Sequence, residues 1–398
     1  MSNYAVKIKN PPVFSKEIIE KAFDGPRCGY KTINCHNELA GSGSLLYLLL
    51  CEKYHPGFKS INGDKGIDKI MSHFRYLLLA GSEPTMGSGP YWGYPVTSAA
   101  IALAKTIPSV WNQLTAAEIE KLDAYMWLFS IGCAWGTNDC NDFWTGPDLI
   151  GNFKKGWNPN HRSPGVLPIM FASIYFGSAE KVNDMLVNFS YDEALAICDR
   201  LDMPNAKKIF QTAGKELFEN GGECYLLKDH EYANKGAGVK HPYVYRGIPL
   251  ADTEGLFNEI LLQNTKGGVV VDIVGDKESG VCGYVMEGSS PVLGLDGMMT
   301  EFVSHDAKGI RSDVIYCSSN FCILSPAMAA MVALGAWNPA DPKNAEASEK
   351  TAISIIDFIY KIEKGYFSYC HGHGTPKNEK SAHGVYPFAK DFWLGMLS

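Results

Sequence analysis

A loop at residues 81–95 combines flat aromatic side chains with a backbone that does not favour a helix. It holds four glycines and three prolines, and it carries Tyr91 and Trp92. Aromatic rings of this kind stack on the C–H faces of sugars, while nearby polar groups fix the sugar's orientation. We expect Tyr91 and Trp92 to bind substrate in this way. Packing of the same rings into the protein's own core is an equally good explanation.

Residues 135–162 form a second segment of this kind, with five Asn, three Asp and three Trp. The Asn side chain is a neutral donor and acceptor, which suits the binding of a carboxylate or of sugar hydroxyls. Asn138 is a candidate catalytic residue. The candidate substrate-binding residues are Asn141, Trp144, Asn152, Trp157, His161 and Arg162. Each Asn alone is better explained as a helix cap or turn residue, but the cluster favours a binding site.

A third segment, residues 236–246, places His241, Tyr243, Tyr245 and Arg246 close together around a proline. In an extended chain the first three would project on one face and Arg246 on the other. A neighbouring cation lowers the pKa of a tyrosine because it favours the phenolate. We therefore take His241 and Tyr243 as candidate catalytic residues, and Tyr245 and Arg246 as candidate substrate-binding residues. A packed, tyrosine-rich loop is the alternative.

The fourth segment, residues 304–321, is predicted to be a loop ahead of an apolar helix that begins near Ile323. Arg311 suits bidentate recognition of a carboxylate, and Tyr316 is a candidate proton carrier. A structural ion pair between Arg311 and Asp313 explains the arginine about as well.

One reaction that suits this set of residues is β-elimination on a polymer of uronic acids. The proton next to the carboxylate is hard to remove while that carboxylate keeps its full charge, so Asn, His or Arg must stabilise the developing negative charge. A Tyr or His then takes the proton, and a Tyr can return one to the leaving oxygen. Common nucleophile, zinc-protease and phosphate-loop motifs are absent from the sequence.

Two other functions remain open on the sequence. A glycoside hydrolase would use two carboxylates. The available carboxylates are Asp139, Asp142, Asp148, Glu287, Asp296 and Asp313. A non-catalytic glycan-binding protein would instead hold sugars by stacking on Trp92, Trp144 and Trp157.

The elements that must position these segments are mostly helices. Apolar residues at helical spacing predict helices at residues 45–54, 67–79, 97–104, 115–133, 168–176, 191–201, 206–219, 253–263, 324–334 and 347–362. Thr115 and Glu118 form a capping-box pattern at the start of one of them. Residues 268–274 and 280–286 predict a short β-hairpin.

The expected fold class is therefore mainly α, an (α/α) toroid or barrel of helical hairpins with a few short strands. We expect one domain over residues 1–398, with residues 1–12 as a possible N-terminal extension. Two packed helical subdomains are the alternative.

Three stretches of the sequence resemble the helical-toroid polysaccharide lyases of the alginate and glucuronan lyase type. They are Gly-Trp-Asn-Pro-Asn-His-Arg at 156–162, Gly-Ile-Arg-Ser-Asp at 309–313 leading to Tyr316, and Gly-Val-Lys-His-Pro at 238–242. The similarity is one of pattern and order over roughly residues 40–340. It implies that Asn138 or Asn141, with His241 and Arg311, neutralises or orients the carboxylate, and that Tyr316 or Tyr243 carries the proton. It implies no metal and no cofactor.

The composition limits the partners. The 398 residues carry a formal net charge of −7, so there is no global basic field for nucleic acid. An anionic polysaccharide substrate would need positive charge gathered locally. No apolar run approaches the about 20 residues of a membrane span, and residues 1–10 lack the apolar stretch of a signal peptide. A secreted or periplasmic location and a cytoplasmic one are both compatible with the sequence, and it favours no oligomeric state.

Cysteine and histidine spacing also bears on metal binding. The eleven cysteines are scattered without zinc-site spacing, which predicts buried, reduced thiols. Residues 369–373, Tyr-Cys-His-Gly-His, with His383, could bind a metal, but this spacing is a weak signal, and we predict no metal.

Overall fold

The computed structural model describes most of the helical part of the chain. The described residues are 14–25, 35–78, 94–139, 159–188, 190–202, 204, 207, 211, 215, 244–245, 247–263, 269–276, 281–287, 302–306, 309–312 and 314–363.

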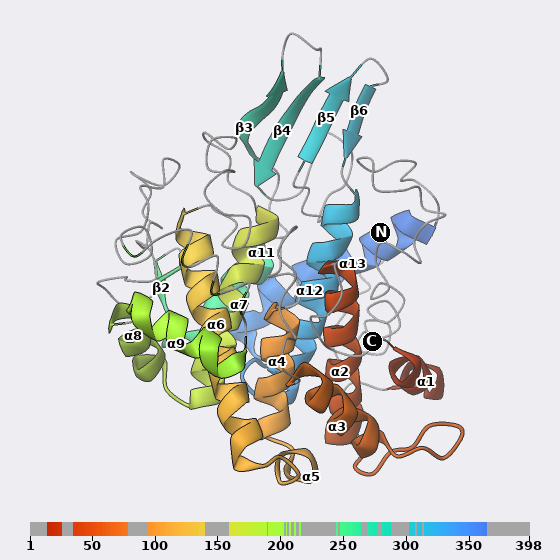
Figure 1. The fold of residues 1–398 in the computed structure, drawn as a ribbon. Helices are drawn as coiled ribbons and strands as arrows, with labels where there is room; N and C mark the ends of the chain where they lie inside the picture. The colour runs from red at the N-terminus through yellow and green to blue at the C-terminus, as the bar shows by residue number, and fades with distance from the viewer. Residues whose placement is uncertain are drawn as a thin grey trace.

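Four helices form the centre of the molecule. They are α2 (Cys35–Tyr54), α4 (Tyr94–Lys105), α7 (Pro159–Phe176) and α12 (Val314–Ala333). Each contains an unbroken run of buried residues, at 43–52, 95–104, 166–173 and 324–333. A helix that is apolar on all sides is stable only in an interior. Accordingly α4 packs against the other three, and α12 also packs against α2 and α7. The four run in the same direction (Figure 1).

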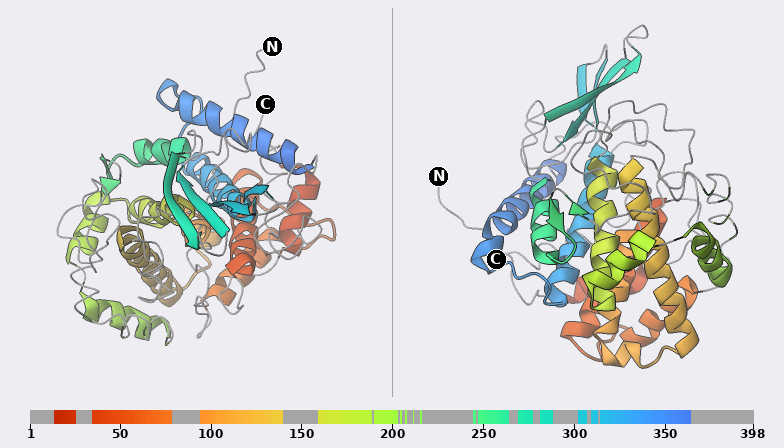
Figure 2. Two further views of the ribbon diagram at one scale, coloured as in Figure 1. Left: turned by 90° about the horizontal axis from the view of Figure 1, so that it is seen from above. Right: turned by 90° about the vertical axis from the view of Figure 1, so that its left-hand side faces the viewer.

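Amphipathic helices surround this inner layer (Figure 2). The fully described ones are α1 (Lys16–Asp24), α3 (Gly66–Leu77), α8 (Ala179–Asn188) and α9 (Tyr191–Leu201). In α3, for example, Ile70, Phe74 and Leu77 are buried at helical spacing. The remaining helical elements are α5 (Pro108–Trp111), α6 (Ala116–Asp139), α11 (Thr253–Gln263), the 3₁₀ helix η4 (Pro342–Asn344) and α13 (Ala345–Glu363).

Capping boxes begin two of the helices. At the start of α6 the Glu118 backbone N–H donates to Thr115 Oγ1 at 3.2 Å, and the Thr115 backbone N–H donates to Glu118 Oε2 at 2.8 Å. The predicted capping box is therefore confirmed. A second box, not predicted, uses Ser190 and Glu193 at the start of α9.

A four-stranded antiparallel sheet lies beyond the N-terminal ends of the inner helices (Figure 1). Its strands are β3 (Val269–Asp276), β4 (Val281–Glu287), β5 (Phe302–Asp306) and β6 (Gly309–Ser312), in that order. The predicted hairpin corresponds to β3 and β4 and is confirmed. A separate hairpin joins β1 (Val244–Tyr245) to β2 (Ile248–Pro249), with Gly247 at φ +80°.

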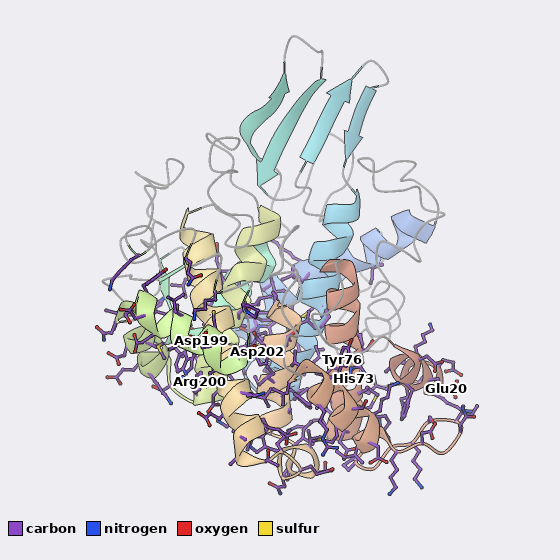
Figure 3. All side chains as sticks on the ribbon, viewed as in Figure 1. Glu20, His73, Tyr76, Asp199, Arg200 and Asp202 are labelled. Atoms are coloured by element: carbon purple, nitrogen blue, oxygen red, sulfur yellow. The ribbon has the colours of Figure 1, made fainter. Side chains whose placement is uncertain are left out.

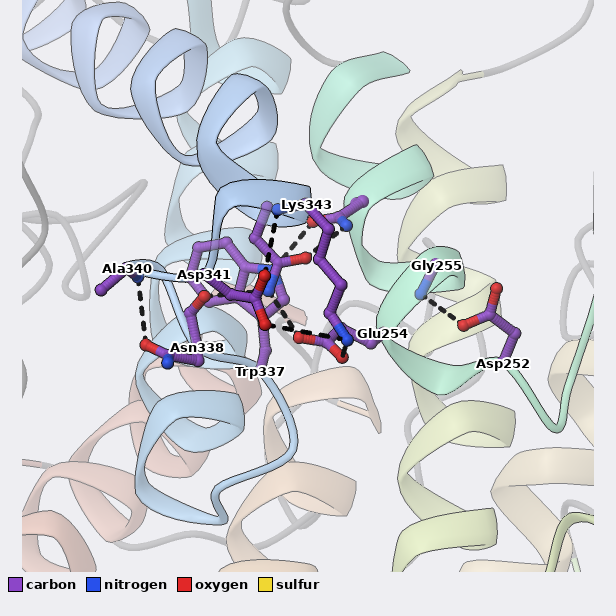
Figure 4. Close-up of polar contacts among 10 residues, drawn as sticks. Asp252, Glu254, Gly255, Trp337, Asn338, Ala340, Asp341 and Lys343 are labelled. Carbon is purple, nitrogen blue, oxygen red and sulfur yellow. Dashed lines mark hydrogen bonds and ion pairs between the residues drawn. The ribbon is translucent and has the colours of Figure 1, made fainter.

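A polar cluster around the buried Asn344 joins α11 to η4 and the residues just before it (Figure 4). The side chain of Asn344, which is fully buried, donates to Glu254 Oε1 and, at 2.9 Å, to the Asn338 carbonyl. It accepts from Asn258 Nδ2 at 2.6 Å, and Asn258 Oδ1 accepts from Trp337 Nε1 at 2.8 Å. Lys343 pairs with the other oxygen of Glu254. Each buried polar atom of the Asn344 side chain thus has a partner.

The prediction of a mainly helical fold is confirmed, and closure of the helices into a ring stays a prediction. Several helices begin earlier than predicted: α2 at Cys35, α7 at Pro159 and α12 at Val314. Glycines, prolines or polar residues interrupt the apolar pattern in their first halves, so the sequence pattern did not indicate a helix there. Helices α1 and α8 were not predicted, and most of the helix predicted at 206–219 lies outside the described residues.

None of the described helices is long and apolar enough to cross a membrane. Cys51 and Cys198 are buried, as predicted, and burial raises the pKa of the Cys51 thiol to about 12. For the other nine cysteines, burial in the reduced state stays a prediction.

Candidate functional site

The candidate segments meet the helical body at one end. Residues 81–95 lead into the start of α4, residues 135–162 run from the last turn of α6 to the first turn of α7, and residues 304–321 lead into α12. These helix ends all lie on the side of the body that faces the four-stranded sheet (Figures 1 and 2). Three of the four segments therefore adjoin the same end of the molecule.

Asn138 and Tyr316 are held by helices at this end. Asn138 lies in the last turn of α6, and Tyr316 is the third residue of α12. Both α4 and α7 pack against α6 as well as against α12. Because packed helix axes lie about 8–10 Å apart, two helices that flank a third are separated by up to about 20 Å. The two helices thus hold both positions at the same end of the body.

The structure corrects the loop predicted at residues 135–162 at both of its ends. Residues 135–139 continue α6, and His161 and Arg162 belong to the first turn of α7. Prolines lie at 159, 164 and 168. Proline is best tolerated in the first turn of a helix, so the sequence favoured a helix that begins at Pro168 and excludes the two earlier prolines.

Nine of the candidate residues lie outside the described residues. They are Tyr91, Trp92, Asn141, Trp144, Asn152, Trp157, His241, Tyr243 and Arg246. The possible metal-binding residues 369–373 and His383 also lie outside them. Of the six carboxylates considered for a hydrolase, Asp139 ends α6 and Glu287 ends β4, and the other four lie outside the described residues.

Arg311 lies on a strand, not in a loop as predicted. Its register partner on β5 is Ser304, and the two positions share one face of the sheet with Asp306. Following the register across β4 to β3 adds Asp272 and Asp276 to this face. The predicted loop at 304–321 is thus two strands and the start of α12. The sequence did not indicate these strands, because β6 has only four residues and begins with glycine, so an alternating strand pattern is hard to recognise there.

Tyr245 is positioned differently from the other candidates. It lies on β1, whose partner β2 packs against α11. This hairpin lies at the side of the helical body, below the four-stranded sheet (Figure 1). Tyr245 is therefore not among the residues held at the sheet-facing helix ends.

The sheet-facing end of the helical body favours negative charge. The N-terminal ends of α2, α4, α7 and α12 all lie there (Figure 1). Each helix N-terminus carries roughly half a positive elementary charge from its aligned peptide dipoles and unpaired N–H groups. Four such ends favour a carboxylate there, and the C-terminal end of α6, which lies at the same end, opposes them in part.

Two described tyrosines at the C-terminal ends of inner helices are unsuited to act as a base. Burial raises the pKa of Tyr54 to about 12. The pKa of Tyr175 is raised further, first by burial and then by its hydroxyl, which donates to Asp123 Oδ1 at 2.6 Å beside the aspartate's charge. Neither phenol would lose its proton near neutral pH.

Among the residues that the structure describes, no three His, Cys, Asp or Glu side chains are grouped so that they could hold a metal ion.

The chain is similar to a gellan lyase from Bacillus sp. The two are 31% identical over 410 residues, which take in 97% of this chain but 16% of that protein. The chain thus spans about a sixth of the length of the curated relative it matches. No family model matches the chain, and no solved structure matches it.

Proposed function

We propose that this chain is a polysaccharide lyase that cleaves a uronate-containing polymer by β-elimination. The observation that carries the proposal is the 31% identity to a gellan lyase, which extends over 97% of the chain. The mainly helical fold agrees with the resemblance to helical-toroid lyases, and the four helix N-termini suit a substrate with carboxylates.

In the proposed reaction a base removes the proton on C5 of a uronate residue. The electron pair of that C–H bond forms the C4–C5 double bond, the C4–O bond breaks, and the leaving oxygen takes up a proton. Arg311 and His241, with Asn138 or Asn141, stabilise the charge that builds up on the carboxyl group. Tyr316 or Tyr243 carries the proton, and no metal takes part.

The remaining candidates would bind the sugars on either side of the cleaved bond. They are Tyr91, Trp92, Trp144, Asn152, Trp157, His161, Arg162 and Arg246; Tyr245, on β1 at the side of the body, is not among them. Gellan is the first substrate to test because of the relative's name, and alginate and glucuronan follow from the resemblance noted in the sequence.

The test is ultraviolet absorbance after the chain is mixed with each of these polymers. Elimination creates a double bond conjugated with the carboxylate, which absorbs, whereas hydrolysis does not. We expect absorbance to rise with at least one polymer. New reducing ends without absorbance would support a hydrolase and contradict the proposal.

Single substitutions test the roles of individual residues. We expect Tyr316→Phe or Tyr243→Phe to abolish turnover while the polymer still binds, and full activity in both variants would refute the tyrosine mechanism. Arg311→Ala should mainly raise KM, or lower kcat if its contact strengthens in the transition state.

A non-catalytic glycan-binding role is the competing proposal, because the matched stretch is a small part of the relative's length. Binding to gellan without any new absorbance or reducing ends would support that role instead.

A further inference from the structure

An open pocket lies at the end of the molecule away from the four-stranded sheet. It has a volume of about 440 Å³ and is lined by α1, by the loop at residues 57–65 and by the first half of α3. Figure 3 shows Glu20 on α1 beside this loop, far from the sheet. The volume is in the range of small-molecule binding pockets, about 300–1,000 Å³.

The loop that forms one wall is held in a fixed shape by its own hydrogen bonds. Ser60 Oγ accepts from the backbone N–H groups of Asn62 at 3.2 Å and Asp64 at 3.1 Å, and it donates to Asp64 Oδ2 at 3.3 Å. The Ser60 backbone N–H donates to the Asp64 carbonyl at 2.9 Å. A wall ordered before binding lowers the entropic cost of taking up a ligand.

The lining residue Phe23 is held in place by packing behind the pocket. Its ring lies edge to face with that of Phe58, with the centroids 5.7 Å apart. Gly66 lies directly against Phe58, and a Cβ at this position would come within 2.2 Å of the ring. The close approach of the α3 start to Phe58 therefore requires glycine.

The lining combines hydrogen-bonding groups of both kinds with an apolar edge. Four carboxylates and two lysines, Lys65 and Lys69, line the pocket. The carboxylates are Glu20, Asp24, Asp64 and Asp68. At the loop tip Ile61 is 61% exposed, which makes it the most exposed of the large hydrophobic side chains among the described residues.

This lining decides between classes of ligand. Four negative and two positive groups disfavour an anion. A metal ion is also disfavoured, since these carboxylates are not grouped as metal ligands. Acceptors, donors and an exposed apolar side chain together suit a neutral sugar, which has hydroxyls on its rim and an apolar C–H face.

We infer that this pocket is a second saccharide-binding site, distinct from the catalytic end, that takes neutral sugar residues of a polysaccharide. The inference rests on the proposed function for the presence of a polysaccharide substrate. Because the pocket lies at the far end of the body, it would hold polymer without taking part in the cleavage step.

The test compares polymer binding by a pocket variant and a control variant. Both are made in the full chain that also carries Tyr316→Phe, so that the polymer is not degraded. The pocket variant is Ile61→Ser with Asp68→Asn and Lys69→Gln. The control is Glu346→Gln with Lys350→Gln, an exposed ion pair on α13 with N···O 2.6 Å. Both leave the net charge unchanged, and equal melting temperatures would establish that both fold.

Binding is measured as retardation in native gels that contain hydroxyethylcellulose, dextran or gellan. We expect the parent and the control to be retarded by at least one of these polymers, and the pocket variant to bind it about ten-fold more weakly. Equal retardation of all three proteins, or no retardation in any gel, would overturn the inference. The inference would also be overturned if calcium chloride alone raised the melting temperature of the parent but not that of the pocket variant, since this result indicates a cation site.

The outcome can be separated from that of the lyase proposal by assaying the same pocket substitutions with Tyr316 intact. Pocket-dependent retardation without absorbance on any uronan would leave the pocket inference standing and refute the lyase. Lyase activity with retardation that is independent of the pocket would refute the pocket inference alone.

Discussion

Replacing Asn344 by alanine tests whether the polar cluster between α11 and η4 stabilises the fold. The substitution removes three hydrogen bonds of a fully buried side chain, to Glu254, Asn258 and the Asn338 carbonyl. It also leaves the amide of Asn258 and the carbonyl of Asn338 each without this partner. Truncation therefore costs both the bonds and the desolvation of groups left unpaired.

The expected loss follows from these contacts. A buried neutral hydrogen bond contributes about 1 kcal/mol net, and one to a charged acceptor about 1.5–3 kcal/mol. The total is about 4 kcal/mol. With an unfolding entropy of about 2.1 cal/mol/K per residue, a chain of this length loses roughly 1.2 °C of melting temperature per kcal/mol, so Tm should fall by about 5 °C.

The assay is thermal unfolding followed by circular dichroism at neutral pH. Asn338→Ala is the matched control, because Asn338 is exposed and its side chain accepts one bond, from the Ala340 N–H at 3.0 Å. Its Tm should fall by about 1 °C or less. Asn344→Asp should be at least as damaging as alanine, because it removes two donors and places a second carboxylate beside Glu254. An Asn344→Ala variant that melts within 1 °C of the parent would refute the reasoning.

Three further predictions follow from described contacts. Burial raises the pKa of Glu254, but hydrogen bonds from Lys343 and Asn344 outweigh it and hold the pKa below its ordinary value. The ionised carboxylate therefore stabilises the fold at pH values above the ordinary pKa, and this stabilisation is lost as the pH falls through the folded pKa. The Tm advantage of the parent over Glu254→Gln should accordingly shrink from about pH 5 to about pH 3. An advantage that does not change over this range would contradict that assignment. Thr115→Ala should cost about 1 kcal/mol in urea unfolding through loss of the α6 cap, with Thr106→Ser as a conservative control. Gly66→Ala should lower Tm by several degrees because its Cβ would collide with Phe58, whereas Gly25→Ala tests a neighbouring close approach, to Ser44.

Some elements could be predicted from the sequence because their local signals agree with their packing. The bounds predicted for α9 and α11 match the structure, and the run of β-branched residues in 268–274 identified β3. The capping box at Thr115 was also readable, because it depends on residues only three apart.

Other features depend on contacts between distant parts of the chain. The first halves of α2 and α12 carry glycine or serine, so local preference alone did not predict that they belong to the helices. The bond between Asn344 and Glu254 joins residues 90 apart. The pocket beside α1 was missed because its residues read separately as charged surface positions, and only the fold brings 20–24 next to 60–72.

The candidate site could be predicted only in part from the sequence. Residue type alone selected Asn138, Arg311 and Tyr316, and the fold holds their helices or strand at or near one end of the body. Residue type could not indicate that Arg311 lies on a strand or that Tyr245 lies elsewhere, because both depend on strand pairing.

The most direct test of the account is ultraviolet absorbance during incubation of this chain with gellan, run beside Tyr316→Phe. The account predicts a steady rise in absorbance with the parent chain and a loss of that rise in the variant, which should still bind gellan. Cleavage of the polymer with no absorbance change would contradict the β-elimination that the account proposes.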